Sequence, residues 1–182
     1  KSGTYTVSLK WEEETKSPSC ALLKVPNSEG SLSDIKAEKA LLDNIHSDYH
    51  AISKTVNEAE KIRRQLKDML PLLSGEKANQ IQKLDSTATA MENKMIQLKH
   101  TGKGQDVIRL PGMLLEKLGY LASTIAVADF KPADQYEQVY QKLHKEWKTV
   151  ENDWNQFKKE EIGAFQNMMQ GNASGPLIIG SE

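Results

Sequence analysis

The pattern of apolar and polar positions changes once along the chain, from a period of two to a period of three to four. In the first eleven residues, apolar Tyr5, Val7, Leu9 and Trp11 alternate with polar Thr4, Thr6, Ser8 and Lys10. This alternation predicts a β-strand with one apolar and one polar face. Since a lone strand is not stable, we expect it either to end a sheet or to pack on helices. Residues 12–20 and 25–31, rich in Glu, Ser and Pro, predict linkers.

A heptad pattern begins at Ser33 and predicts one long helix. Its first row is interrupted by Arg63 and contains Ile35, Leu42, Tyr49, Val56 and Leu70. Its second row contains Ile45, Ile52, Ala59, Leu66 and Leu73. Five such heptads correspond to a helix of roughly 60 Å. Ser33 is expected to cap its N-terminus, with Asp34 in the first turn, and Pro71 with Ser74-Gly75 to end it.

Three further segments have helical spacing. The first runs from Glu76 to about His100, with Ile81, Leu84, Ala88, Met91, Met95 and Leu98 on one face. The second runs from Pro111 to about Ala126, with Leu114, Leu118, Leu121 and Ile125. The third starts after Pro132 and continues towards Gly171, with Tyr136, Val139, Leu143, Trp147, Val150, Trp154, Phe157, Ile162, Phe165 and Met168.

These segments predict a mainly α fold, an antiparallel bundle of about four helices with an N-terminal β-strand and a short extended C-terminal tail. We expect residues 1–30 to form a strand and linker, residues 31–171 the bundle, and residues 172–182 the tail. The apolar tail "GPLIIGSE" could pair with the N-terminal strand.

Charge and cysteine content exclude several classes of protein. Lys and Arg number 24 and Asp and Glu 25, so the net charge of −1 argues against binding to nucleic acid or to an anionic membrane surface. No apolar run approaches the roughly 20 residues that span a bilayer. The one cysteine, Cys20, excludes an intrachain disulfide and a four-cysteine zinc site. The chain starts at Lys1 without a signal-peptide pattern, so we expect it to be part of something longer.

The stretch Gly102-Lys103-Gly104 looks like a fragment of a phosphate-binding loop. That loop requires GxxxxGK followed by Ser or Thr after a buried strand, and this stretch has neither the spacing nor the hydroxyl and follows a helix. We therefore predict a connection between helices, with Pro111 in the first turn of the next helix.

Residues able to bind metal or to catalyse a reaction have simpler structural interpretations. His46 and His50 are four residues apart near Asp43 and Asp48, but they lie on the flank of the seam, where solvent exposure is expected; an adventitious metal site is the alternative. The carboxylates are expected to be solvated charge rather than a catalytic pair: Glu12, Glu13, Glu14, Glu58, Glu60, Glu160 and Glu161. No Ser-His-Asp or Cys-His signature is found. We assign no catalytic, cofactor-binding or metal-binding residue, and no cofactor.

Two groups of side chains could instead bind a partner. Lys61, Arg63, Arg64 and Lys67 are expected to pair along the helix with Glu58 and Glu60; a docking patch for an acidic surface is the alternative. Trp147, Trp154 and Phe157 are expected to be core. For carbohydrate binding, Trp11, Tyr136 and Tyr140 are better candidates. Asn172 begins an "NAS" sequence, which matches a glycosylation acceptor.

Several motifs resemble one family over nearly all of the chain. "KIRRQL", "GQDVIRLPGMLLEKLGYLAS" and "FQNMM" followed by "GPLII" resemble the C-terminal helical region of large bacterial β-propeller proteins with sialidase-like or sortilin-like repeats, often labelled glycosyl hydrolases. In that family, a β-sandwich segment whose last strand looks like "GTYTVSLK" precedes the helices. Here "KSPSCALLKVPNSEG" replaces the usual short turn after that strand.

The resemblance implies that residues 1–30 are the end of a truncated β-sandwich plus a linker. It also implies a secreted or periplasmic protein in which this chain is a non-catalytic structural or interaction module, with the upstream propeller and sandwich domains as partners. No catalytic residue of the propeller lies in this chain. The alternatives are a self-associating coiled-coil module that forms a homo-oligomer, and a carbohydrate-binding accessory domain.

Overall fold

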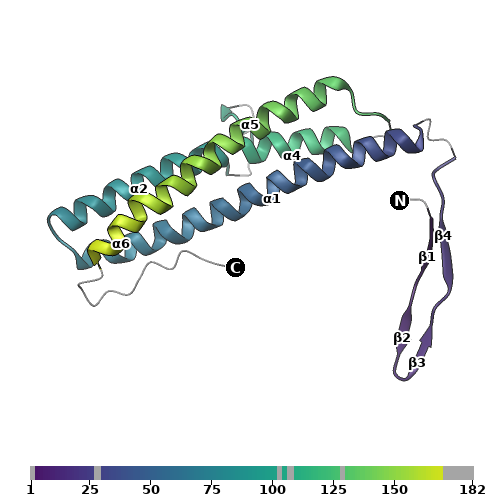
Figure 1. Ribbon diagram of the computed structural model, residues 1–182, viewed down its shortest axis with the longest axis horizontal. Coiled ribbons are helices and arrows are strands. Elements are labelled where there is room, and N and C mark those ends of the chain that lie inside the picture. The colour runs from purple at the N-terminus through teal and green to yellow at the C-terminus, as the bar shows by residue number, and fades with distance from the viewer. Residues whose placement is uncertain (1–2, 27–29, 102–103, 106–108, 128–129, 170–182) are drawn as a thin grey trace.

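The computed structural model describes residues 3–26, 30–101, 104–105, 109–127 and 130–169. Within these residues, the chain forms an elongated bundle of four main helices, from one end of which a narrow β-arm projects (Figure 1). This confirms the predicted mainly α bundle with an N-terminal β-segment. The predicted C-terminal tail, residues 172–182, and Asn172 lie outside the described residues.

Helix α1, Leu32–Met69, is the longest element and begins with a capping box. Ser31, rather than the predicted Ser33, is the N-cap: its hydroxyl accepts a hydrogen bond from Asp34 N at 3.1 Å, and Asp34 Oδ2 accepts one from Ser31 N at 2.8 Å. The hydrogen bonds from Ser31 lower the pKa of the Asp34 carboxyl. At the other end, Pro71 lies in a 3-10 turn, Leu70–Leu72, that ends the helix as predicted.

One of the two predicted seam rows is correct along α1, although its last member, Leu73, lies beyond the helix and is only partly buried. Ile45, Ile52, Ala59 and Leu66 are fully buried. The other row is correct at Val56, which is buried, but Leu41, Asp48 and Ile62 face the core one position before the predicted row, and Tyr49 is exposed. A helix with 3.6 residues per turn drifts away from a strict heptad, and α1 contacts α2, α4 and α5 over a stripe wider than a coiled-coil seam.

Helix α2, Glu76–Met95, antiparallel to α1, is shorter than predicted. Ile81, Leu84, Ala88 and Met95 are buried, but the chain leaves the helix at Ile96 and Leu98 is exposed. Helix α4, Leu114–Ile125, buries Leu114, Leu118, Leu121 and Ile125 as predicted.

Glu116 joins the ends of α2 and α4. Its carboxylate accepts hydrogen bonds from Met113 N at 2.7 Å and from Gln97 N at 3.1 Å. Pro111 was predicted in the first turn of α4, but it precedes the helix, and its carbonyl accepts a hydrogen bond from Gln97 Nε2 at 3.0 Å. The prediction was wrong because the Glu116 carboxylate satisfies the free N–H of Met113 and starts the helix there. The stretch around Gly104 lies in this helix connection, while Gly102 and Lys103 are outside the described residues.

Helix α5, Asp134–Phe157, continues through a π-turn, Lys158–Ile162, into α6, Gly163–Met169. Leu143, Trp147, Val150, Trp154, Phe157, Ile162 and Phe165 are buried as predicted. The prediction was wrong at two positions, since Tyr140 and Met169 are buried while Val139 and Met168 are exposed. The extra residue in the π-turn keeps Ile162 and Phe165 on the core-facing side.

Residues 3–22 form one long β-hairpin. Strands β1, Gly3–Thr6, and β4, Ser19–Leu22, pair antiparallel, as do β2, Leu9–Trp11, and β3, Glu14–Lys16, and the same register continues from Gly3↔Leu22 to Trp11↔Glu14. Residues 12–20 were predicted to be a linker, and this prediction was wrong. Their sequence lacks apolar alternation, and they are held instead by backbone pairing to the first strand.

Gly112 makes the tightest approach among the described glycines. A Cβ atom at this position would lie 2.9 Å from Glu116 Cβ, whereas one at Gly119, inside α4, would have ordinary contact with Tyr49 Cε2 at 3.7 Å. We predict that Gly112→Ala lowers the free energy of unfolding by about 1–3 kcal/mol through overpacking. The matched Gly119→Ala should raise it by about 0.5–1 kcal/mol, because alanine favours a helix interior. Urea unfolding monitored by circular dichroism measures both, and equal effects would contradict the role given to Gly112.

Candidate functional site

One face of the β-arm presents apolar side chains to solvent, with Lys16 and Glu14 opposite Leu9 and Trp11 near its tip. Val7, Leu9, Trp11 and Leu22 are 55%, 67%, 74% and 53% exposed and, from the register, lie on one face, together with Tyr5 and Cys20. The opposite face carries hydroxyls, and Ser8 Oγ lies 3.0 Å from Ser17 Oγ. We call the first surface the apolar face of the arm. In folded proteins, the apolar face of a β-sheet is normally covered by other parts of the protein. The exposure of this face therefore marks a contact surface.

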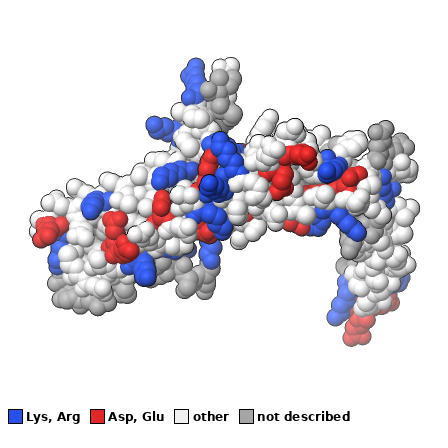
Figure 2. Space-filling view, turned by 45° about the horizontal axis from the view of Figure 1, so that its top comes forward, with Lys and Arg blue, Asp and Glu red and all other residues white. Residues whose placement is uncertain are grey.

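The two outer edges of the arm also remain open in the part of the chain that the structure describes, since each strand pairs with one neighbour there. Figure 2 shows the visible side of the arm as largely uncharged, with Lys and Glu side chains gathered at its tip. The turn residue there, Glu12, has a φ of 50°, a conformation that favours glycine or asparagine. An open β-edge beside an apolar face is the feature that β-addition between proteins uses.

A buried polar cluster connects α1 to α5. Asp48 Oδ2 lies 2.6 Å from His144 Nδ1, and the Tyr140 hydroxyl lies 3.4 Å from the same nitrogen. Burial, with the adjacent charge of Asp48, raises the pKa of Tyr140 to about 12. Tyr140, a predicted carbohydrate contact, is therefore in the core. Asp48 occupies a core-facing position seven residues after Leu41, which is the signal in the sequence that could have identified it.

Arg63 connects α1 to α2. Its Nε donates a hydrogen bond to Asp85 Oδ1 at 3.0 Å, and its Nη1 forms an ion pair with Glu92, which is buried. Desolvation lowers the pKa of the Arg63 guanidinium, but the two carboxylates outweigh it and raise the value. The predicted pairing along α1 is thus wrong for Arg63, whose partners lie across the helix interface. Lys61, Arg64 and Lys67 remain exposed.

Glu58 also has partners on another helix. It accepts hydrogen bonds from Trp154 Nε1 at 2.8 Å and from Lys158 Nζ at 2.9 Å. It was predicted to be solvated charge, which is wrong because the indole N–H of a buried tryptophan requires an acceptor. Trp154 itself is core, as predicted, and Lys158 lies at the start of the π-turn.

The residues considered for metal binding and those considered for carbohydrate binding do not form a common site in the described part of the chain. His46 and His50 are exposed, and Asp43 pairs with Lys39. Within the described residues, no group of three His, Cys, Asp or Glu side chains could hold a metal ion. Trp11 is on the arm and Tyr136 lines a groove on the bundle, so the structure does not bring them together.

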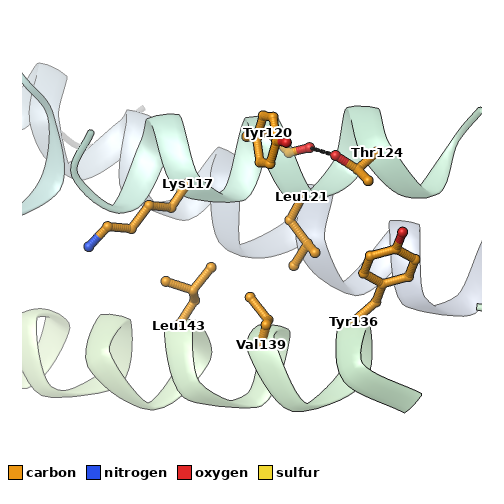
Figure 3. A pocket seen from close by; sticks show the side chains of 7 residues that line it. All are labelled: Lys117, Tyr120, Leu121, Thr124, Tyr136, Val139 and Leu143. Atoms are coloured by element: carbon orange, nitrogen blue, oxygen red, sulfur yellow. Dashed lines mark hydrogen bonds between the residues drawn. The ribbon is translucent and has the colours of Figure 1, made fainter. Parts of the chain in front are cut away.

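That groove has a volume of about 290 Å³ and lies between α4 and α5, which run antiparallel there (Figure 3). Leu121, Val139 and Leu143 form its floor, Tyr136 closes one end, and the Lys117 side chain lies at the other. Thr124 Oγ1 lies on the wall and donates a hydrogen bond to the Tyr120 carbonyl at 2.9 Å. The floor is therefore apolar, and the lining cation is at one end.

We predict that Arg63→Met lowers the free energy of unfolding by about 3–5 kcal/mol, because it leaves the Glu92 carboxylate buried without its partner. Adding Glu92→Met should restore most of the loss, since an apolar pair of similar volume can replace a buried ion pair. The control is Arg64→Met at the exposed neighbouring position, with an expected change within about 0.5 kcal/mol. Urea unfolding of the wild type, Arg63→Met, Glu92→Met, the double variant and the Arg64→Met control measures the coupling, and additive effects of Arg63→Met and Glu92→Met would contradict it.

We predict that one tyrosine of the folded chain ionises only near pH 12, and that Tyr140→Phe removes this step. The unfolded chain loses the phenolic proton near pH 10, before the folded chain does, so Tyr140 contributes stability that is complete below pH 10 and is lost as the pH rises towards 12. Ultraviolet absorbance of tyrosinate, followed against pH, detects the step. Tyr120→Phe, at an exposed position, is the control and should leave the high-pH step in place.

No helix in the described part of the chain is long and apolar enough to cross a membrane. Comparisons of this chain with protein-family models, with curated proteins and with solved structures find no match.

Proposed function

We propose that this chain is a non-catalytic structural and interaction module, in which the bundle is a rigid support and the β-arm is the docking element. The proposal rests on one observation. The apolar face of the arm is exposed, although the helical bundle of the same chain buries its apolar side chains in a core. A two-stranded ribbon is marginally stable by itself, so the arm gains most of its order by pairing with another surface.

The bundle is suited to be the support. Two clusters of buried side chains fill it, one formed by α1, α4 and α5 with Met95 at the end of α2, and the other by α1, α2, α5, the π-turn and α6. Four mostly buried charged side chains each link two helices of the bundle: Asp48, Glu58, Arg63 and Glu92. Such connections restrict how the helices slide past one another, which supports a rigid role.

The resemblance seen in the sequence supplies the partner of the arm. Under this proposal, the chain is the helical C-terminal part of a secreted or periplasmic propeller protein of glycan-hydrolase type. The arm would then pair with the β-sandwich segment or with the propeller. Main-chain hydrogen bonds along an open edge would hold it, and Val7, Leu9 and Trp11 would fill apolar pockets.

Self-association is the second candidate, favoured by the open edges of the arm. It differs from a coiled-coil dimer along the heptad rows, because Ile45, Ile52, Ala59 and Leu66 are buried within the bundle of the same chain. An arm-mediated dimer would bury edges and the apolar face instead. A carbohydrate-binding role would rest on Trp11 on the arm and Tyr136 at the groove, which the structure keeps apart.

The single cysteine allows the partner to be identified. Cys20 is exposed on the arm and faces the same side as Tyr5 and Leu22, so a photoreactive maleimide labels the arm only. When the labelled chain is mixed with the separately expressed sandwich and propeller segments that the proposal names as its partners, we expect cross-links to a β-structured segment. Cross-links to a second copy of the chain would establish self-association, and cross-links confined to the bundle would contradict the docking role of the arm.

Point substitutions give the matched control. We predict that Leu9→Thr and Trp11→Thr abolish the cross-link, because they remove apolar surface but keep residues that favour strands. Lys10→Thr, on the opposite face of the same strand, should leave it unchanged. Since none of these residues is in the core, the urea unfolding of the bundle should be the same for all three proteins, within about 0.5 kcal/mol.

A further inference from the structure

We infer that the groove between α4 and α5 is a binding site for a small amphiphile with an apolar body of about eight carbons and an anionic head. Nothing in the docking role of the arm requires this site. It rests on the lining of the groove, on the position of its one cation and on its size.

The lining selects an apolar body. Three aliphatic side chains, Leu121, Val139 and Leu143, form a continuous floor (Figure 3). Val139 is 46% exposed although it sits at a core-like spacing on α5, so the helix leaves an apolar side chain in water at this point. The Thr124 hydroxyl on the wall is already used by the Tyr120 carbonyl. A polar ligand would therefore lose hydrogen bonds to water on this floor without replacing them.

The Lys117 ammonium group favours a ligand with an anionic head group. The Lys117 side chain extends along the groove to the end opposite Tyr136. In the part of the chain that the structure describes, no salt bridge involves Lys117, and it is the one cation among the residues that line the groove. An ammonium at the mouth of an apolar groove favours a carboxylate over a neutral or cationic head.

The dimensions select the length. Lys117 and Thr124 are seven residues apart on one helix, which gives the groove a length of roughly 10 Å at a rise of about 1.5 Å per residue. Its volume of about 290 Å³ corresponds to roughly ten water-sized volumes, and therefore to about ten heavy atoms. Octanoate, with eight carbons and two oxygens, has this size.

The test titrates the intact chain with octanoate, octylammonium and octanol below their micellar concentrations. Amide chemical shifts report where each one binds. We expect octanoate to shift residues of the groove with a dissociation constant on the order of 1 mM or below, as ten heavy atoms allow. Octylammonium and octanol should bind about tenfold more weakly, because they lack the charge that meets Lys117.

Three variants make the result specific. Lys117→Gln should weaken octanoate about tenfold but leave octanol unchanged. Val139→Trp, which fills an exposed position on the floor, should abolish the binding of both. Lys83→Gln, an exposed lysine on α2, is the control and should change nothing. Circular dichroism shows that each variant folds.

Equal affinity for the three probes would overturn the anionic head. Shifts spread over other surfaces, or no shift at the groove, would overturn the site. Since these measurements concern the bundle and the cross-linking concerns the arm, each proposal can fail while the other stands.

Discussion

The whole bundle depends on the burial of one stripe of α1. Ile45, Ile52, Ala59 and Leu66 are shielded from water only because α2, α4 and α5 pack on the same helix. Each fully buried aliphatic side chain contributes about 1.5–3 kcal/mol, so the stripe is a large share of the stability of a domain this size. An isolated α1 would expose it. The other helices are therefore positioned by the need to cover the apolar stripe of α1.

Apolar burial does not by itself fix how far each helix is shifted along its neighbour. The polar contacts between helices fix this shift. Arg63 reaches Asp85 and Glu92 on α2, Asp48 meets His144 on α5, and Glu58 receives Trp154 and Lys158. Each pair is satisfied in one alignment of its two helices, and a shift by one turn would leave a charge or an indole N–H without a partner. Desolvation offsets much of the energy of such pairs, so their main effect is on specificity rather than on stability.

Much of the bundle could be predicted because helical periodicity reports which side is buried. The apolar spacing even indicates the π-turn. Phe157 and Ile162 are five residues apart, whereas a regular helix would place Glu161 and Ala164 towards the core. The interhelical pairs could not be predicted, because spacing within one helix does not say which residue lies opposite on another. Strands β3 and β4, the returning half of the arm, were not predicted for a related reason. Residues 14–22 carry little apolar alternation, and their partners are backbone groups, which have no signature in side-chain sequence.

Folding leaves two kinds of apolar surface in water, and they differ in what can cover them. The arm offers backbone donors and acceptors along its edges together with an apolar face, so a partner must supply a strand as well as apolar contacts. The groove between α4 and α5 has helices for walls, whose backbone groups are already paired, and a partner there needs only apolar volume and a charge for Lys117. A protein surface therefore suits the arm, whereas a small molecule suits the groove. The two surfaces are built from different residues, those of β1–β4 and those of α4 and α5, so occupation of the groove and docking of the arm need not compete.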